Sequence, residues 1–97
     1  MRYEIILSPE ALKDLRRLEA RDRAAVRDAL EVHLRHEPTK VSRSRIKRLR
    51  DLAHPQYRLR VGEIRVFYDV AEREVRVHAI LFKPMVEEWL KEEGKRS

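Results

Sequence analysis

The sequence contains no cysteine, few glycines and no long apolar run. Without cysteine, the chain has no disulfide bond, no catalytic thiol and no cysteine-ligated zinc. Because small secreted domains often depend on disulfides, we expect a cytoplasmic protein. The apolar run near the N-terminus is too short for a signal peptide, and no run approaches the roughly 20 residues of a transmembrane helix. We therefore expect no membrane partner.

Several motifs of enzyme chemistry are absent as well. The sequence has no glycine-rich phosphate loop, no Ser-His-Asp order and no acidic cluster of the kind that holds a catalytic metal. We therefore expect neither a metal ion nor a small-molecule cofactor. The length fits one fold, so residues 1–97 are expected to form a single domain with a modest core.

Charge, in contrast, is abundant and unevenly distributed. Charged residues make up 41% of the chain, and the net charge is +6. Between residues 40 and 65, nine basic residues stand against only Asp51 and Glu63, a local net charge of +7. A one-signed cluster on a nearly neutral scaffold is typical of a protein that binds a polyanion. The alternative is a solvated charged surface without a partner.

The N-terminal half predicts a strand followed by two helices. Residues 3–7 form a short β-prone run. Ser8-Pro9-Glu10 combines an N-cap residue, a proline for the first helical position and an acidic first turn, which together predict a helix start. Asp22 predicts the N-cap of a second helix, and Pro38 predicts its end. Two helices joined this closely are typical of an αα-hairpin.

The C-terminal half predicts antiparallel strands and a short final helix. Strands are expected at 57–61, 64–70 and 74–82, with Val75, Val77, Ala79 and Leu81 alternating on the last; residues 46–52 form either a strand or an extended turn. Gly62 supplies the positive φ that a two-residue hairpin turn requires. The predicted fold class is α+β: an N-terminal strand, an αα-hairpin, a twisted and mainly antiparallel sheet, and a short C-terminal helix. We expect helices on one face of the sheet and an open opposite face.

The stretch YRLRVGEIRVFYDV, residues 57–70, sorts its side chains onto two faces when it is paired around Gly62. The apolar face then pairs Tyr57 with Tyr68, Leu59 with Val66 and Val61 with Ile64. The opposite face sets Arg60 directly across from Arg65, with Arg58 two residues along. Like charges paired across strands repel each other and destabilise a sheet. A bound anion would reverse the sign of that interaction.

Basic side chains around this hairpin are the candidates for binding phosphate. Arginine stays protonated and presents a planar fork of donors that matches phosphate oxygens. The candidate anion-binding residues are Lys47, Arg48, Arg50, Arg58, Arg60 and Arg65. Phe67 lies on the same predicted face, where it either stacks on a nucleobase or packs against a neighbour. In the alternative interpretation, nearby acids such as Asp69 neutralise the arginines.

The four histidines fall into two pairs. His33 and His36 have a spacing that suits a metal, but no third ligand is evident, and a helix end is the simpler interpretation. His54 precedes Pro55 in a turn beside the arginines, and strand alternation places His78 on the arginine side. A histidine beside a phosphate can act as a general acid or base. A register shift of one residue would turn His78 to the other face.

Several of these segments together resemble a known family. The opening YEIILSPEALKDLRRL, the HEP that ends the second helix, the KRLR that follows and YRLRVGEIRVFYDV are similar to the RelE/ParE superfamily of toxins from type II toxin–antitoxin modules. The resemblance covers almost the whole chain and implies a RelE-like fold. RelE-like members enter the ribosomal A site and cleave mRNA without a metal, by attack of the ribose 2′-oxygen on the adjacent phosphate. ParE-like members share the fold but poison DNA gyrase.

The resemblance also implies roles for individual residues. Arg58 and Arg60 fall where RelE-like toxins have basic residues that contact phosphate, and Arg65 falls on the phosphate-stabilising arginine. Lys83 stands where those toxins usually carry an arginine, and Trp89 approximately where they carry a tyrosine. Tryptophan does not exchange protons as tyrosine does, and lysine is a point charge instead of a fork. The electrostatic half of the site is therefore retained, and the acid–base half is altered.

Two functions follow from the resemblance. The first is a ribosome-dependent, metal-free mRNA endoribonuclease that inhibits translation, with Arg60, Arg65, Lys83 and His78 as catalytic residues. Its expected RNA-binding residues are Lys47, Arg48, Arg50, Arg58 and Phe67. The second is a gyrase inhibitor, or a catalytically weak module that binds an antitoxin or RNA. Both imply a cognate antitoxin as protein partner, and the first adds mRNA on the ribosome.

Overall fold

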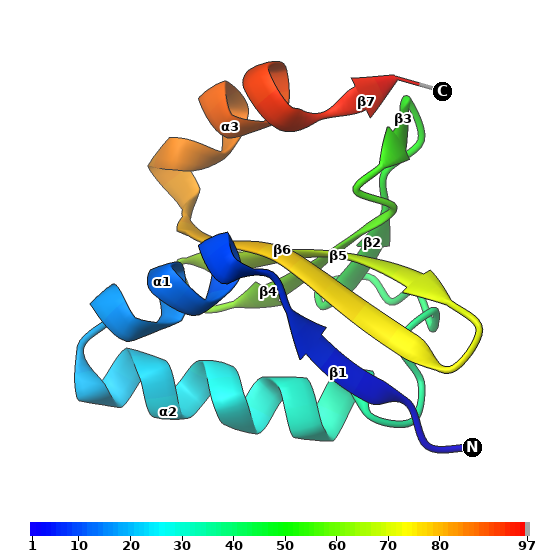
Figure 1. The fold of residues 1–97 in the computed structure, drawn as a ribbon, viewed down its shortest axis with the longest axis horizontal. Helices are drawn as coiled ribbons and strands as arrows, with labels where there is room; N and C mark the ends of the chain where they lie inside the picture. Colours follow the sequence, from blue (N-terminus) through cyan, green and yellow to red (C-terminus); the bar gives the residue numbers. More distant parts are fainter. Residues whose placement is uncertain (97) are drawn as a thin grey trace.

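The computed structural model describes residues 1–96 and shows an α+β fold, as predicted (Figure 1). Its helices are α1 (Pro9–Arg17), α2 (Ala20–Ala29), the π-helix η1 (Leu30–Leu34), the 3₁₀-helix η2 (Lys83–Met85) and α3 (Val86–Glu93). Its strands are β1 (Glu4–Leu7), β2 (Ile46–Arg48), β3 (Leu52–His54), β4 (Tyr57–Val61), β5 (Ile64–Ala71), β6 (Glu74–Phe82) and β7 (Lys95–Arg96). Strands β2 and β3 stand where a single strand or an extended turn was expected at residues 46–52, and β7 follows the last helix, where no strand was expected.

Five strands form one mixed sheet in the order β1-β6-β5-β4-β2. Strand β1 runs parallel to β6, and the other neighbours are antiparallel. The remaining strands, β3 and β7, form a separate antiparallel pair. Strand β5 is central, so its side chains lie between those of β4 and β6 on each face of the sheet.

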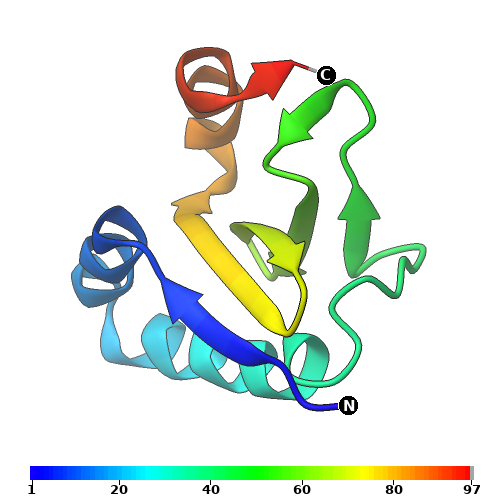
Figure 2. The same ribbon diagram turned by 45° about the vertical axis from the view of Figure 1, so that its right-hand side comes forward.

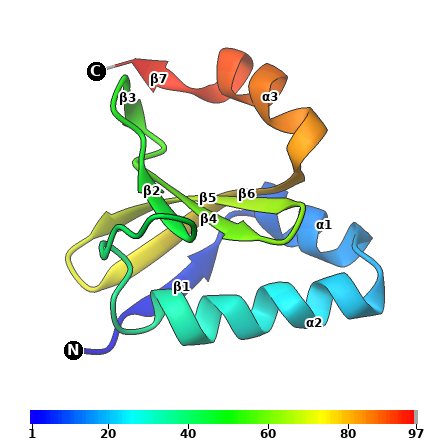
Figure 3. The ribbon, with the colours of Figure 1, turned by 180° about the vertical axis from the view of Figure 1, so that it is seen from behind.

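The helical hairpin covers one face of the sheet (Figure 3). Ser8 caps α1 as predicted: its hydroxyl oxygen accepts a hydrogen bond from the Ala11 amide at 3.0 Å. Helix α2 begins earlier than predicted, at Ala20 with Glu19 as N-cap instead of Asp22. A tight connection between the helices leaves no room for the extra loop residues that an Asp22 cap would need.

The main core lies between this hairpin and the sheet. It contains Leu15 and Val26 from the helices and Leu59, Val66 and Tyr68 from the strands, all nearly or fully buried. The Tyr68 ring stacks on Tyr57 with centroids 5.5 Å apart, and its hydroxyl donates to the Pro38 carbonyl at 2.6 Å. Burial raises the pKa of Tyr68, and Tyr57 raises it further. Tyr68 therefore ties the central strand to the segment that follows the helices.

Replacing Tyr68 by phenylalanine should lower the free energy of unfolding by about 1–2 kcal/mol, because the buried Pro38 carbonyl loses its donor. Urea denaturation monitored by circular dichroism measures this. Tyr57→Phe is the matched control, since it keeps the aromatic stack and removes a hydroxyl with no hydrogen bond among residues 1–96. Equal losses in the two variants would contradict the assigned role of the hydroxyl.

A β-bulge changes the alternation of β6 at its middle. Phe67 pairs with Ala79 and Tyr68 with Val77, so His78 is an extra residue between them. The predicted alternation is therefore right for Val77 but wrong beyond it: Ile80 enters the core, and Ala79 shares the opposite face with Phe67. A bulge of this kind re-aims side chains at one point of a strand.

The opposite face of the sheet is covered, not open as predicted. Helix α3 and the β3–β7 pair lie over it, on the far side from α1 and α2 (Figures 1 and 2). The Trp89 ring of α3 stacks on Phe67 of β5, with centroids 5.1 Å apart. Trp89 therefore anchors α3 on the sheet, as its place on the apolar side of the predicted final helix indicated.

Candidate functional site

The register of the β4–β5 hairpin gathers the arginines on the face beneath α3. Arg60 pairs with Arg65, Arg58 with Phe67, and Lys47 of β2 with Arg58. Residues paired across strands share a face, so Arg58, Arg60 and Arg65 lie together; we call these three the arginine cluster. The three apolar pairs of the other face are also as predicted. Gly62 turns the hairpin with φ of +59°, the conformation for which glycine was expected.

Arg65 is more enclosed than a surface phosphate ligand. Only 8% of the residue is exposed, and its Nη1 donates to the Gly62 carbonyl at 2.7 Å and the Ile64 carbonyl at 3.1 Å. The guanidinium therefore folds back on the hairpin turn and fixes it. Only Nη1 makes these two bonds, so Nη2 and Nε remain as donors for another partner. The two bonds also fix the positive group in place beside Arg58 and Arg60.

Arg58 carries the least satisfied polar atom of the site. Its Nε is buried and has no hydrogen-bond partner among residues 1–96. Burial lowers the pKa of Arg58, and the nearby charges of Arg65 and Arg60 lower it further. Both effects disfavour the charged guanidinium in the free protein. An anion bound beside the guanidinium would offset this repulsion.

The other predicted basic residues are only partly brought together. Lys47 shares the face of the arginine cluster, and Lys83 lies at the hairpin turn, where its amide donates to the Glu63 carbonyl at 2.8 Å. Arg48 lies on the other side of the sheet, with its guanidinium carbon 5.2 Å from the Tyr57 ring centroid. Arg50 is exposed in the turn between β2 and β3.

The prediction that Phe67 stacks on a nucleobase is wrong for this conformation. Phe67 is 1% exposed, and its ring stacks on Trp89. It packs against a neighbour, which is the alternative that the sequence also allowed. Trp89 is only half-buried and lines a pocket, so it is the aromatic residue of this face that a ligand can reach.

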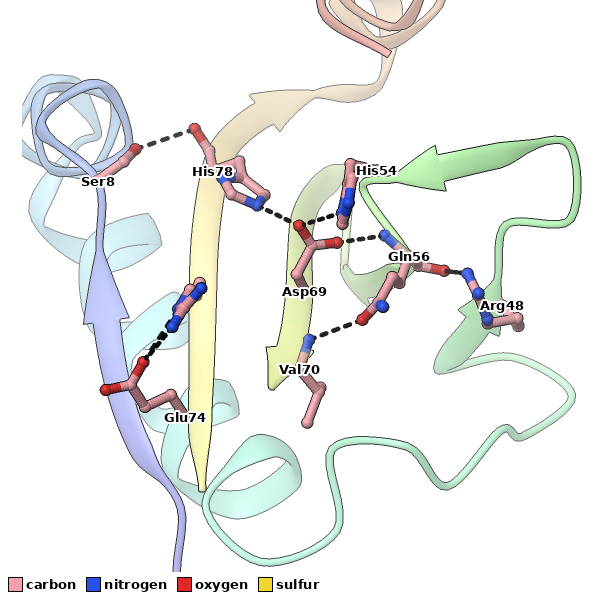
Figure 4. A network of polar contacts seen from close by, with 9 residues as sticks. Ser8, Arg48, His54, Gln56, Asp69, Val70, Glu74 and His78 are labelled. Carbon is pink, nitrogen blue, oxygen red and sulfur yellow. Dashed lines mark hydrogen bonds and ion pairs between the residues drawn. The ribbon is translucent and has the colours of Figure 1, made fainter. Parts of the chain in front are cut away.

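Asp69 binds two histidines at once, a convergence that the sequence did not predict (Figure 4). Its Oδ2 lies 2.8 Å from His54 Nδ1 and 2.7 Å from His78 Nε2. Its Oδ1 accepts a hydrogen bond from the backbone N–H of Gln56 at 2.7 Å. The predicted placement of His78 on the arginine face is correct. Asp69 does not pair with Arg65 in the described residues, so this acid does not neutralise the arginine cluster.

The surroundings of Asp69 favour its charged form. Burial raises the pKa of this carboxyl, but the hydrogen bonds from His78, the Gln56 amide and His54 outweigh it and hold the pKa below its usual value. Strand alternation alone places Asp69 and His78 on one face. His54 is the last residue of the three-residue strand β3, which is too short to show an alternation pattern, so no sequence signal places it there.

A pocket of about 480 Å³ opens beside this network, under α3. Its lining includes Ser8 and Glu10 at the start of α1, Trp89 and Glu93 of α3, Lys95 of β7, and the His54–Asp69–His78 group.

Within residues 1–96, no group of three or more histidine and acidic side chains has the geometry of a metal site. His36 is engaged elsewhere, with Nδ1 3.2 Å from the Met1 carbonyl.

Comparison with known proteins decides the family. The model of the ParE toxin of the type II toxin–antitoxin system parDE matches residues 5–82, most of the chain. The chain belongs to the RelE/ParE superfamily of type II toxins. A search of curated proteins found no match. No helix in residues 1–96 of the toxin is long and apolar enough to cross a membrane.

Solved structures of RelE-like proteins share the fold of the toxin. The toxin of the RelBE2 complex from Mycobacterium tuberculosis is 25% identical, with a TM-score of 0.73 over 84% of this chain and 99% of that one. The archaeal RelE–RelB complex from Pyrococcus horikoshii matches at 20% identity and a TM-score of 0.70, over 86% and 97%. The YoeB dimer from Staphylococcus aureus matches at 17% and 0.64, over 84% and 98%. Two of these three structures are toxin–antitoxin complexes.

Proposed function

We propose that the toxin is an endoribonuclease that cleaves mRNA on the ribosome and thereby inhibits translation. The observation that carries this proposal is Arg58, a half-buried guanidinium whose Nε has no partner among residues 1–96 and which lies beside Arg60 and Arg65. A buried donor without an acceptor costs stability, and so does the clustering of like charge. Both costs are removed when a backbone phosphate occupies the face.

The arginine cluster fits the charge that develops in RNA cleavage. Attack of the ribose 2′-oxygen on the adjacent phosphate passes through a phosphorane with two negative charges. Donors that are fixed before the reaction stabilise such charge most effectively. Arg65 is fixed by the hairpin carbonyls, and Arg58 is held between Lys47 and Phe67 in the register of the sheet. Lys83, at the hairpin turn, adds a cation at the same end of the face.

An antitoxin is the expected protein partner of this face. The face combines basic residues with a half-buried tryptophan, so the matching segment carries acidic and apolar side chains and folds when it binds. Structures with this fold from M. tuberculosis, P. horikoshii and Methanococcus jannaschii are toxin–antitoxin complexes. Co-purification with the protein encoded beside the gene tests this part of the proposal.

Inhibition of DNA gyrase is the second candidate function. The observation in its favour is that the matching family model describes ParE toxins, whereas the structural neighbours are RelE and YoeB proteins. The substitutions at Lys83 and Trp89 point in the same direction, because they change the acid–base part of a RelE-like site. The two functions differ in their target, mRNA on the ribosome or DNA gyrase, and an experiment in cells distinguishes them.

Induction of the toxin without its antitoxin should arrest growth and produce cleaved mRNA. Primer extension on abundant messages maps new 5′ ends, and a reporter of the DNA-damage response is read in the same cultures. We expect new ends within coding regions and a silent reporter. Intact messages together with an active DNA-damage reporter would contradict mRNA cleavage and support gyrase inhibition.

A further inference from the structure

We propose that His54 and His78 form the acid–base pair that moves protons during cleavage of the RNA phosphodiester, with Asp69 as the residue that positions both. This inference rests on the proposed endoribonuclease activity and adds what the arginine cluster lacks. Arginine stays protonated and does not exchange protons at neutral pH. Trp89 has no acidic or basic group, so neither it nor the arginines provide a general base.

The hydrogen bonds of Asp69 define which ring nitrogens are available. An ionised carboxylate only accepts hydrogen bonds, so His54 Nδ1 and His78 Nε2 both donate to Asp69 Oδ2, at 2.8 and 2.7 Å. The second nitrogens, His54 Nε2 and His78 Nδ1, are then free to take or give a proton. No hydrogen bond within residues 1–96 occupies them. This is the arrangement by which a carboxylate holds a catalytic imidazole in one tautomer.

Two imidazoles on one carboxylate favour opposite protonation states. One negative charge stabilises one imidazolium, and a second imidazolium on the same oxygen is opposed by the first. We therefore assign one ring as the protonated partner and the other as the neutral partner. These are the general acid and the general base that a single transphosphorylation step requires.

The step balances with these two groups alone. The neutral imidazole takes the proton of the 2′-hydroxyl while the 2′-oxygen forms a bond to phosphorus. The bond from phosphorus to the 5′-oxygen breaks, and that oxygen takes a proton from the imidazolium. The products are a 2′,3′-cyclic phosphate and a 5′-hydroxyl, and the pair ends with its protonation states exchanged.

The pocket places a cation and an aromatic wall beside the histidines. Lys95 of β7 and Trp89 of α3 line it together with both imidazoles. Two acids, Glu10 of α1 and Glu93 of α3, also line it. Its volume of about 480 Å³ is within the range of small-molecule sites and suits one nucleotide.

Arg58 lies near this pocket in the register of the sheet but is not one of the residues that line it. It pairs with Phe67, and Asp69 lies two residues further along the same face of β5. Such diagonal neighbours have backbones about 7–8 Å apart, within reach of a long side chain. A phosphate bound beside Asp69 would therefore lie within reach of the Arg58 guanidinium on one side and of the free imidazole nitrogens on the other.

The test measures single-turnover cleavage of mRNA on programmed ribosomes by purified toxin, from pH 5 to pH 9. His54→Gln and His78→Gln are the test variants, because glutamine retains a donor for Asp69 but does not titrate. His36→Gln is the matched control. We expect a bell-shaped profile for the wild type, a loss of about 10²–10⁴-fold in each test variant with one limb of the bell removed, and no change in the control.

A second substrate identifies which histidine is the acid. RNA with sulfur in place of the 5′-oxygen at the cleavage site releases a thiolate, which needs no proton. We expect this RNA to restore the rate of the variant that lacks the acid and not of the other. A rescue of this kind does not occur when a variant is merely misfolded, so the test holds even if stability changes.

The outcomes separate this inference from the function on which it rests. Cleavage by the wild type with rates within twofold in both test variants overturns the acid–base assignment and leaves the endoribonuclease proposal standing. Reduced rates with an unchanged bell and no rescue by the sulfur substrate also overturn the assignment, because they indicate a structural role. No cleavage by the wild type removes the endoribonuclease proposal itself.

Discussion

Replacing Arg58 by methionine should make the free toxin more stable and, at the same time, remove its toxicity. The substitution eliminates a buried donor that has no partner among residues 1–96 and relieves repulsion from Arg60 and Arg65. Methionine fills similar space with a flexible apolar side chain. We expect the free energy of unfolding to rise by about 1 kcal/mol. Cleavage should fall by about 10²–10³-fold, the usual effect of removing one donor from a developing anion.

Denaturant unfolding and growth after induction measure the two effects of Arg58→Met. Arg21→Met is the matched control, because Arg21 is an exposed residue of α2, which lies on the opposite side of the sheet from the arginine cluster. Methionine also has a helix propensity similar to that of arginine. It should leave both stability and toxicity unchanged. A destabilised Arg58→Met protein, or a stable one that still arrests growth, would be incompatible with an anion site at Arg58.

Replacing Asp69 by alanine should cause the largest loss of stability among the polar residues of this face. Asp69 is 8% exposed and accepts three hydrogen bonds, from His54, His78 and the Gln56 amide. Removing it leaves those donors without their acceptor and breaks the side-chain link between His54 of β3 and the central strand β5. We expect a loss of about 3 kcal/mol, typical of a broken network around a buried charge. For a domain of this size the melting temperature then falls by roughly 10–20 °C.

The stability that Asp69 provides should also depend on pH. Because the pKa of Asp69 is lower in the folded protein than in the unfolded chain, its contribution is complete above the unfolded value, roughly 4, and is lost as the pH falls through the folded value. Melting curves from pH 7 down to pH 3 should show a steeper acid decline for the wild type than for Asp69→Ala. Asp28→Ala, at an exposed position of α2, is the control. Parallel curves would contradict this linkage.

Local signals in the sequence predicted the elements and the hairpin, and the reason is that they act over a few residues. The Ser8 cap, the Gly62 turn and the pairing of Arg60 with Arg65 each follow from side-chain chemistry or from strand alternation. The family resemblance was also correct, because the same hairpin carries it. Strand alternation also predicted that Asp69 and His78 lie on the arginine face, and this prediction is correct.

Long-range contacts set the parts of the site that the sequence did not show. Docking of α3 depends on the stack of Trp89 on Phe67, two residues far apart in the chain. The bulge at His78 is a local departure from regular pairing that no composition signals. His54 reaches Asp69 from the short strand β3, which lies outside the five-stranded sheet. As a result, the arginine cluster was predictable from its strands, whereas the pocket beneath α3 was not.

Membership of the superfamily does not by itself assign an activity, since the same fold serves toxins with different targets. For this toxin the assignment depends on the face beneath α3. The arginine cluster supplies positive charge with an unsatisfied donor, and the adjacent histidines, both held by Asp69, supply imidazoles that can exchange protons.

The most direct test of this account is cleavage of a defined mRNA on programmed ribosomes by purified wild-type toxin and Arg58→Met. The products are separated on a sequencing gel, and their ends are identified by treatment with polynucleotide kinase. We predict that the wild type yields a single cut with a 2′,3′-cyclic phosphate and a 5′-hydroxyl, and that Arg58→Met yields almost none. Intact mRNA with folded wild-type toxin, or equal cleavage by both proteins, would contradict the account.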